Sequence, residues 1–166
     1  MPSDSGWMST LCSIKIPRLV SEHRHVRGIA DTSVVIDLGR LDRRDLPAEL
    51  AISAVTLAEL AAGPHATSDR AEQARRQDTL QRAEATFEAL PFDAASARAY
   101  GRVYAAVSAG GRKARGRRAL DLLIAATALA AGSPLYTRSP DDFRELDGLV
   151  EVVAADSPRG ELRGGE

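Results

Sequence analysis

Short apolar runs alternate along the chain with longer stretches of helical spacing. The apolar runs are bounded by small, polar or turn-forming residues, which is typical of buried strands; they cover residues 29–30, 51–55, 135–137 and 150–153. Strands that alternate with helices in this way favour an α/β fold. We therefore predict a three-layer domain with a mainly parallel central sheet flanked by helices.

Cap and stop residues give the bounds of the expected helices. A short helix should follow Asp31, and four longer stretches are predicted to be helical: residues 56–62, 68–90, 93–109 and 119–131. Asp93 is expected to cap the third of these. Gly63-Pro64, Pro91 and Gly110-Gly111 are expected to stop the first three.

The two ends of the chain lack this periodicity. Residues 1–25 mix Pro, Ser and His with isolated apolar residues, and residues 156–166 end in a Gly-rich segment. We expect both to be tails, which leaves residues 26–155 as the domain.

Composition narrows the class of protein. A chain of 166 residues with 44% hydrophobic and 27% charged residues fits one globular domain rather than a disordered or fibrous protein. Cys12 is the sole cysteine, so neither an intramolecular disulfide nor a cysteine-rich zinc site is possible. No window approaches the roughly 20 apolar residues that span a bilayer, and no signal-peptide pattern opens the chain. These features predict a cytoplasmic protein.

The net charge of −1 conceals a basic cluster directly before the last predicted helix. Its members are Arg112, Lys113, Arg115, Arg117 and Arg118. Such a cluster is either a solvated loop or a contact for nucleic-acid phosphates, and contacts of the second kind carry no sequence information.

Two candidate acids have simple structural explanations when taken alone. Asp31 lies at the end of the first predicted strand, where ligands of open parallel sheets bind, but an Asp in this position also caps a helix. Thr56 and Glu59 have the spacing of a capping box, which by itself is the better explanation of Glu59.

A third candidate, Asp121, is harder to assign to local structure, and the fourth is open among three residues. Asp121 is flanked by apolar residues in the 119–131 helix, where burial of a carboxylate without a partner is costly. The segment after the 135–137 strand offers Ser139, Asp141 and Asp142, for which an ordinary turn is an equally good explanation.

Taken together, these candidate acids suggest a metal site more strongly than any one of them does alone. Carboxylates gathered at one sheet edge repel one another unless a divalent cation neutralises them. Mg²⁺ prefers oxygen ligands and is commonly held by one or two carboxylates, and Mn²⁺ is an alternative. Such an ion would promote attack of water on a phosphodiester.

Four segments in order resemble the PIN-domain family and, within it, the VapC-type toxins. They are Asp31-Thr32-Ser33 after an apolar strand, Thr56-Leu57-Ala58-Glu59-Leu60, residues 121–128 (DLLIAATA) and residues 137–143 (TRSPDDF). Each is weak alone, but the ordered set is fairly specific and covers the whole predicted domain.

The resemblance implies a PIN-like fold and a Mg²⁺- or Mn²⁺-dependent endoribonuclease that acts on RNA, pairs with a VapB-like antitoxin and forms a homodimer. It implies Asp31 and Asp121 as direct metal ligands and Glu59 as the group that orients or activates water. Asp142 is the candidate for the fourth catalytic position, with Asp141 and Ser139 as alternatives, because many relatives carry the acid or Asn where Ser139 stands.

Other classes of function remain open at this stage. A non-catalytic PIN-like module that binds RNA or protein and a housekeeping RNA-processing nuclease would share the same motifs. A phosphoacceptor domain fits poorly, because Lys113 is the sole lysine of the predicted domain and lies in a Gly- and Arg-rich loop.

Overall fold

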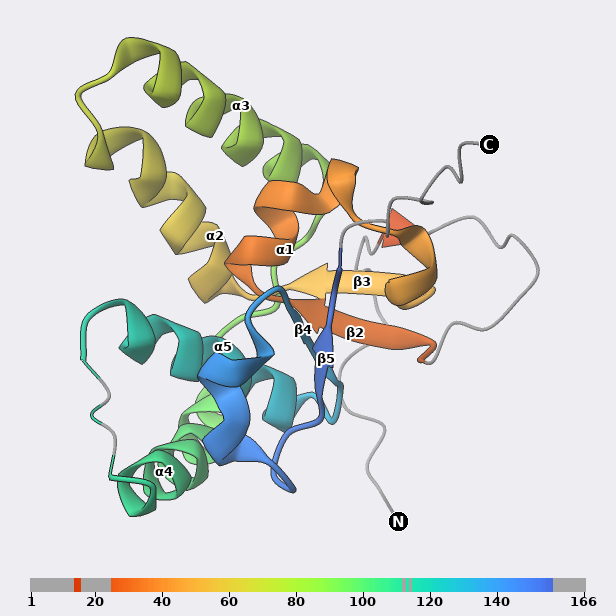
Figure 1. Ribbon diagram of the computed structural model, residues 1–166, viewed down its shortest axis with the longest axis vertical. Coiled ribbons are helices and arrows are strands. Elements are labelled where there is room, and N and C mark those ends of the chain that lie inside the picture. The colour runs from red at the N-terminus through yellow and green to blue at the C-terminus, as the bar shows by residue number, and fades with distance from the viewer. Residues whose placement is uncertain (1–13, 16–24, 112, 114, 157–166) are drawn as a thin grey trace, which may run out of the picture.

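The computed structural model describes residues 14–15, 25–111, 113 and 115–156. Its centre is a five-stranded sheet in the order β1-β3-β2-β4-β5, in which β3, β2, β4 and β5 run parallel and β1 pairs antiparallel with β3 (Figure 1). The strands are β1 (Ile14–Lys15), β2 (Arg27–Ala30), β3 (Glu49–Ile52), β4 (Leu135–Thr137) and β5 (Val152–Ala154). The predicted α/β fold with a mainly parallel sheet is confirmed.

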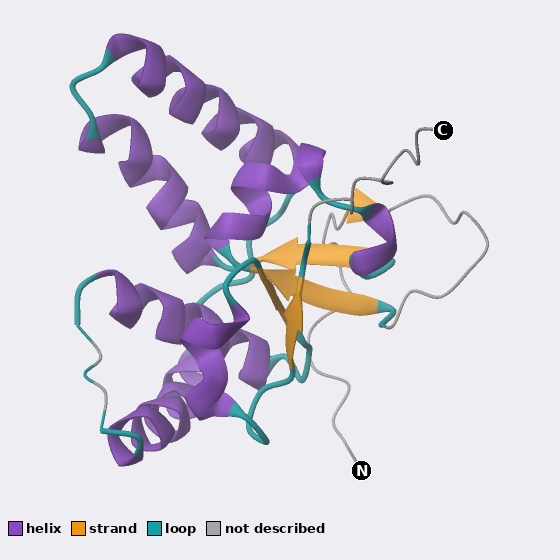
Figure 2. Cartoon of the chain, viewed as in Figure 1, coloured by secondary structure: helices purple, strands orange, loops and turns teal. Residues whose placement is uncertain are grey.

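Helices cover both faces of this sheet, as Figure 2 shows. The α-helices are α1 (Thr32–Asp37), α2 (Ala54–Ala62), α3 (Arg70–Thr86), α4 (Ala94–Ala109) and α5 (Arg117–Ala130). Short 3₁₀ turns connect them: η1 (Leu38–Arg40), η2 (Arg43–Asp45), η3 (Gly63–Ala66) and η4 (Pro140–Leu146). Helices α1, α2 and α3 lie on one side, whereas α4, α5 and η4 lie on the other.

Alternation along the strands divides the core into two halves. Ile29 and Leu135 pack against α4 and α5, whereas their chain neighbours Ala30 and Tyr136 pack in the half formed with α1, α2 and α3. Because successive side chains of a strand point to opposite faces, a short apolar run supplies both halves at once. This explains why the sheet strands read as continuous apolar runs rather than as an alternating pattern.

Gly28 is required by the packing of β2 against β4. A side chain at this position would collide with the ring of Tyr136, which lies directly over the glycine. The close approach allows the large Tyr136 side chain, 1% exposed, to fill the core beside the central strand.

Several predicted bounds shift because of tertiary contacts. The 51–55 run divides at Ser53, where β3 ends and α2 begins. The 68–90 helix ends at Thr86, since Leu90 donates from its backbone N to the Ile52 carbonyl at 2.9 Å and extends along the sheet edge.

The remaining elements follow the prediction more closely. The 93–109 helix, its Asp93 cap and the 135–137 strand are confirmed, while the 119–131 helix begins two residues early and the 150–153 strand is displaced to β5. Residues 14–15 form an edge strand, which the prediction of a tail over residues 1–25 did not anticipate. The rest of that tail, and residues 157–166, lie outside the described residues.

No helix within the described ranges is both long and apolar enough to cross a membrane.

Candidate active site

The candidate site lies where β2, β3 and β4 end. From the central strand β2 the chain passes first to β3 on one side and later to β4 on the other, so strand order reverses at β2. Crevices at such a reversal are the usual ligand sites of open parallel sheets. Asp31 directly follows β2, and Thr137 is the last residue of β4.

Asp31 is buried, at 6% exposure, and both of its carboxylate oxygens are engaged. Its Oδ1 accepts from the backbone N of Val34 at 3.1 Å and from the hydroxyl of Ser33 at 2.6 Å. Its Oδ2 accepts from the Thr137 hydroxyl at 2.5 Å. Asp31 therefore caps α1, but one lone pair of Oδ2 remains available to a further partner.

Glu59 does not belong to a capping box, so that interpretation was wrong. The N-cap of α2 is Ser53, whose hydroxyl oxygen accepts from the backbone N of Thr56 at 3.0 Å. Thr56 is buried within the first turn, and Glu59 lies in the second half of the helix. The Glu59 carboxylate instead accepts a hydrogen bond from the Thr32 hydroxyl of α1, which directs it toward Asp31.

Asp121 lies in the second turn of α5 and is half-buried. Burial of its carboxyl group raises the pKa of Asp121 from the ordinary value of 3.8 to about 6. The charges of three other carboxylates add to this rise: those of Glu59, Asp31 and Asp142. The fold therefore brings Asp31, Glu59 and Asp142 close enough for their charges to act on Asp121. Their individual roles stay predictions.

The segment after β4 favours Asp142 for the fourth position. The charge of Asp142 acts on Asp121, and its main-chain carbonyl accepts from Nη1 of Arg118 at 2.8 Å. Ser139 is instead tied to the end of the strand, where its backbone N donates to the Thr137 hydroxyl at 3.1 Å. Asp141 and Asp142 are both exposed, but no effect of Asp141 on Asp121 is found.

Hydroxyl groups that support the acids were missing from the predicted site. Thr32, Ser33 and Thr137 each donate to one of its carboxylates. The Ser33 hydroxyl also accepts from the backbone N of Arg138 at 3.1 Å, so it links α1 to the loop after β4. Two features of the sequence point to these hydroxyl groups. Thr32 and Ser33 directly follow Asp31, and Thr137 is the last residue of β4.

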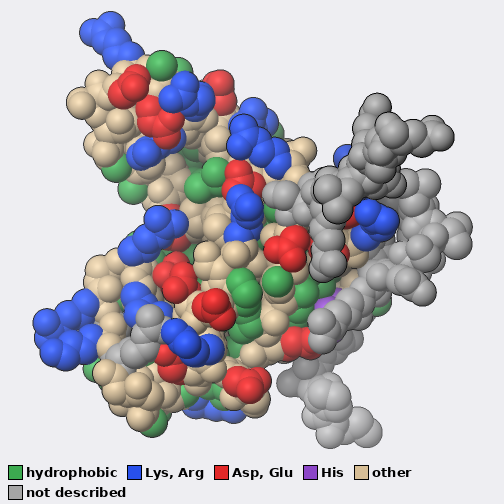
Figure 3. Space-filling view, viewed as in Figure 1, with side chains coloured by type: hydrophobic (Ala, Val, Ile, Leu, Met, Phe, Trp, Pro, Cys, Tyr) green, Lys and Arg blue, Asp and Glu red, His purple; other side chains and the backbone are tan. Residues whose placement is uncertain are grey.

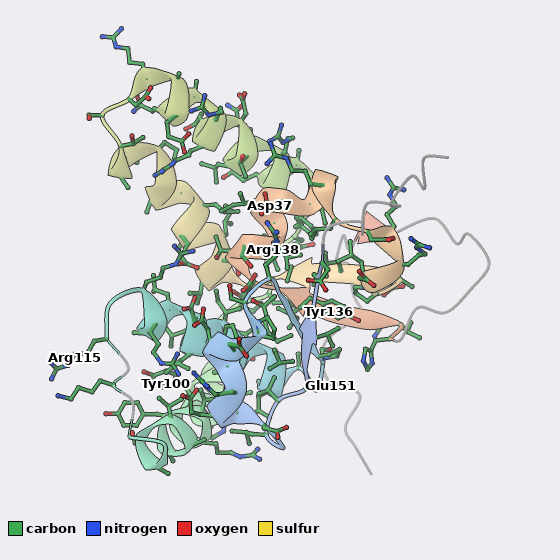
Figure 4. The ribbon with its side chains drawn as sticks, in the orientation of Figure 1. Asp37, Tyr100, Arg115, Tyr136, Arg138 and Glu151 are labelled. Atoms are coloured by element: carbon green, nitrogen blue, oxygen red, sulfur yellow. The ribbon has the colours of Figure 1, made fainter. Side chains whose placement is uncertain are left out.

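An ion pair reinforces the same link. The guanidinium of Arg138 binds the carboxylate of Asp37 at the end of α1, and Figure 4 shows the two side chains next to each other between α1 and the β4 loop. Acidic and basic side chains lie together over the middle of this face of the molecule (Figure 3).

The oxygen ligands at the candidate site fit a hard divalent cation that takes only a few of its ligands from the protein. In the described part of the chain, no three acidic, His or Cys side chains converge closely enough to enclose a metal by themselves. Mg²⁺ does not need such a cage, because it retains several waters and takes one or two carboxylates. Asp31, with a free lone pair on Oδ2, and the half-buried Asp121 are the two carboxylates that would serve as such ligands.

A mainly parallel sheet with acidic side chains near its strand-order reversal defines an α/β protein with an acidic candidate site. Comparison with known families agrees: the PIN domain model matches residues 29–149. The chain belongs to the PIN-domain family.

Individual proteins of known sequence or structure are also similar to this chain. The chain is 39% identical to "Ribonuclease VapC5" of Mycobacterium tuberculosis over 128 residues, which cover 75% of this chain and 91% of the relative. The crystal structure of VapBC-5, a member of the VapBC family of toxin-antitoxin systems from Mycobacterium tuberculosis, superposes with a TM-score of 0.66 at 38% identity and covers 78% of this chain and 97% of that chain. VapBC2 from Rickettsia felis, solved bound to a DNA fragment from its promoter, shares the fold with a TM-score of 0.62 at 22% identity, covering 78% and 99%.

Proposed function

We propose that this chain is an endoribonuclease and the toxin of a VapBC-type toxin–antitoxin pair, with activity that depends on Mg²⁺ or Mn²⁺. The likeness to a VapC ribonuclease supports the reaction class. The observation that supports the proposal most directly is that Asp121 is half-buried and lies within range of the charges of Glu59, Asp31 and Asp142. A site with that excess of negative charge is suited to a divalent cation and a phosphodiester.

Within this site Asp31 and Asp121 are the proposed ligands of the ion. When bound, the ion supplies positive charge that offsets the charge developing on the phosphodiester during hydrolysis. Thr137 and Ser33 hold the Asp31 carboxylate in one orientation, so its remaining lone pair is preorganised.

Glu59 is the proposed group that orients the attacking water and accepts its proton. The Thr32 hydroxyl occupies one lone pair of Oε2, which leaves the other lone pairs of the carboxylate for water. Asp142, exposed on η4, is the proposed fourth member because its charge acts on Asp121.

The same proposal gives the partners: an RNA substrate, a VapB-like antitoxin and a second copy of the chain in a homodimer. It also places the protein in the cytoplasm. A short antitoxin-like reading frame beside the gene would support the toxin role over a housekeeping RNA-processing nuclease. A non-catalytic RNA- or protein-binding module is the remaining alternative, and cleavage assays separate it from both.

The decisive test is cleavage of mixed single-stranded RNA with Mg²⁺, with Mn²⁺ and with EDTA. Asp31→Asn should abolish cleavage, because the neutral amide still caps α1 but binds the ion poorly. Asp93→Asn is the matched control, since Asp93 is also a helix N-cap, with its Oδ1 accepting from Ser96 N at 2.9 Å, and lies on α4 away from the acids. Cleavage that persists in EDTA or survives Asp31→Asn contradicts the mechanism.

A further inference from the structure

Two adjacent arginines at the start of α5 have opposite environments. Arg118 is tied down: Nη2 lies 2.9 Å from Oε2 of Glu145, with side chains only 17% and 10% exposed, and Nη1 binds the Asp142 carbonyl. Arg117 is exposed and, within the described residues, has neither an ion-pair nor a hydrogen-bond partner. The described members of the basic cluster therefore differ: the Arg118 side chain is held in place, whereas the donors of Arg117 are unused.

The position of Arg117 places those donors at the candidate active site. It lies one helical turn before Asp121, and side chains four residues apart share a helix face. Arg117 also lines a groove together with Thr32 and Glu59, and its charge acts on Asp121. Arg115, in contrast, points outward from the loop before α5 (Figure 4).

The groove beside Arg117 offers a path along which an RNA strand can lie. It has a volume of about 1250 Å³ and runs from Thr32, Glu59 and Arg117 between α1 and the α2–α3 pair. Farther along it, Arg75 and Arg76 are bound to Glu72 and therefore contribute little free positive charge. Arg40, Arg43 and Arg82 also line the groove; near Thr32 and Glu59, Arg117 is a described cation that retains free donors.

The chemistry of the site requires such a cation. Four carboxylates repel an approaching phosphodiester, and the charge of Arg117 opposes theirs at Asp121. The planar guanidinium offers five N–H donors in a fork that matches two phosphate oxygens. Because Arg117 is not committed to any carboxylate of the described chain, a phosphate does not have to displace an existing ion pair.

We propose that Arg117 binds a backbone phosphate of the RNA next to the bond that is cut, whereas Arg118 holds the Asp142 segment in place. The proposal rests on the proposed function and adds the residue that receives the substrate. Arg117 thus sets substrate affinity without reading sequence, and the acids carry out the reaction.

The test measures binding of a short single-stranded RNA to full-length Asp31→Asn protein over a range of salt concentrations. Adding Arg117→Ala should weaken binding about tenfold, as expected for one charge-assisted contact. The slope of log K against log salt should fall in magnitude by about 0.7, the value for one phosphate contact on a single strand. Arg117→Lys should restore most of the slope, because the charge remains, but less of the affinity.

Arg102→Ala is the matched control, since Arg102 is exposed on α4 and does not line the groove. In the active protein, Arg117→Ala should raise KM about tenfold, whereas Arg102→Ala should leave KM and kcat unchanged. An unchanged salt slope for Arg117→Ala, or equal effects of the two variants, overturns the proposal. Failure of the wild type to cleave any RNA refutes the proposed function instead, while the binding slopes still decide the role of Arg117.

Discussion

Replacement of Asp121 by Asn should stabilise the metal-free protein at neutral and higher pH. The folded protein raises the pKa of this carboxyl from 3.8 to about 6, so the native state binds its proton more tightly than the unfolded chain does. Stability is then unaffected by this group below the unfolded pKa, falls as pH rises from about 4 to 6, and carries the whole penalty above that range.

The size of the penalty follows from the same two values. A pKa difference of about 2 corresponds to about 3 kcal/mol at 1.36 kcal/mol for each tenfold change in the proton-binding constant. Solvent screening of this half-exposed carboxyl reduces the expectation to about 2 kcal/mol. Asn has nearly the same shape and no charge, so Asp121→Asn removes first the cost of burying the charge and then the repulsion by neighbouring carboxylates, with little change in packing.

The assay is urea unfolding of both proteins in EDTA at pH 4 and at pH 8. The free energies of unfolding should differ by no more than about 0.5 kcal/mol at pH 4 and by about 2 kcal/mol at pH 8, with the variant the more stable. Asp147→Asn, a change at an exposed acid beyond η4, should show no such difference. A variant that is less stable than wild type at pH 8, or equally stabilised at both pH values, refutes the picture of crowded carboxylates.

Three other substitutions test the supporting structure. Thr137→Val keeps the shape of a buried side chain but removes the hydroxyl that donates to Asp31. We expect the free energy of unfolding in urea to fall by roughly 1–3 kcal/mol and cleavage to fall at least tenfold. Thr137→Ser should largely restore both. Arg118→Ala should destabilise the fold by about 2–3 kcal/mol because Glu145 is left buried, and a double-mutant cycle with Glu145→Ala should show positive coupling; additive losses would contradict the pair. Gly28→Ala should lower stability by about 1–3 kcal/mol through the clash with the tyrosine ring of β4, and a neutral thermal melt would mean that the ring moves aside freely.

The parts of the fold that local chemistry controls could be predicted from the sequence. An apolar pair followed by Asp31-Thr32-Ser33 identified both the end of a strand and the cap of a helix, and the structure has both. Asp121 was recognisable because a carboxylate among apolar neighbours is costly unless something specific compensates it. These inferences needed only residues adjacent in the chain.

The inferences that failed needed contacts between distant segments. The spacing of Thr56 and Glu59 is the same whether or not they form a capping box, and the contact between Glu59 and Thr32 across two helices decides the question. The length of the 68–90 helix was misjudged because Leu90 pairs with the backbone of Ile52, which no helical pattern records. The hydroxyl of Thr137 reaches Asp31 across 106 positions of sequence, so its role was invisible to spacing.

This separation also has a consequence during synthesis. The central strand emerges early, but its neighbour β4 follows about 100 residues later, which corresponds to about 5–20 s of translation. Until then Asp31 has neither the Thr137 hydroxyl nor the loop that carries Asp142. A growing chain therefore cannot assemble the candidate site until β4 and η4 have been synthesised.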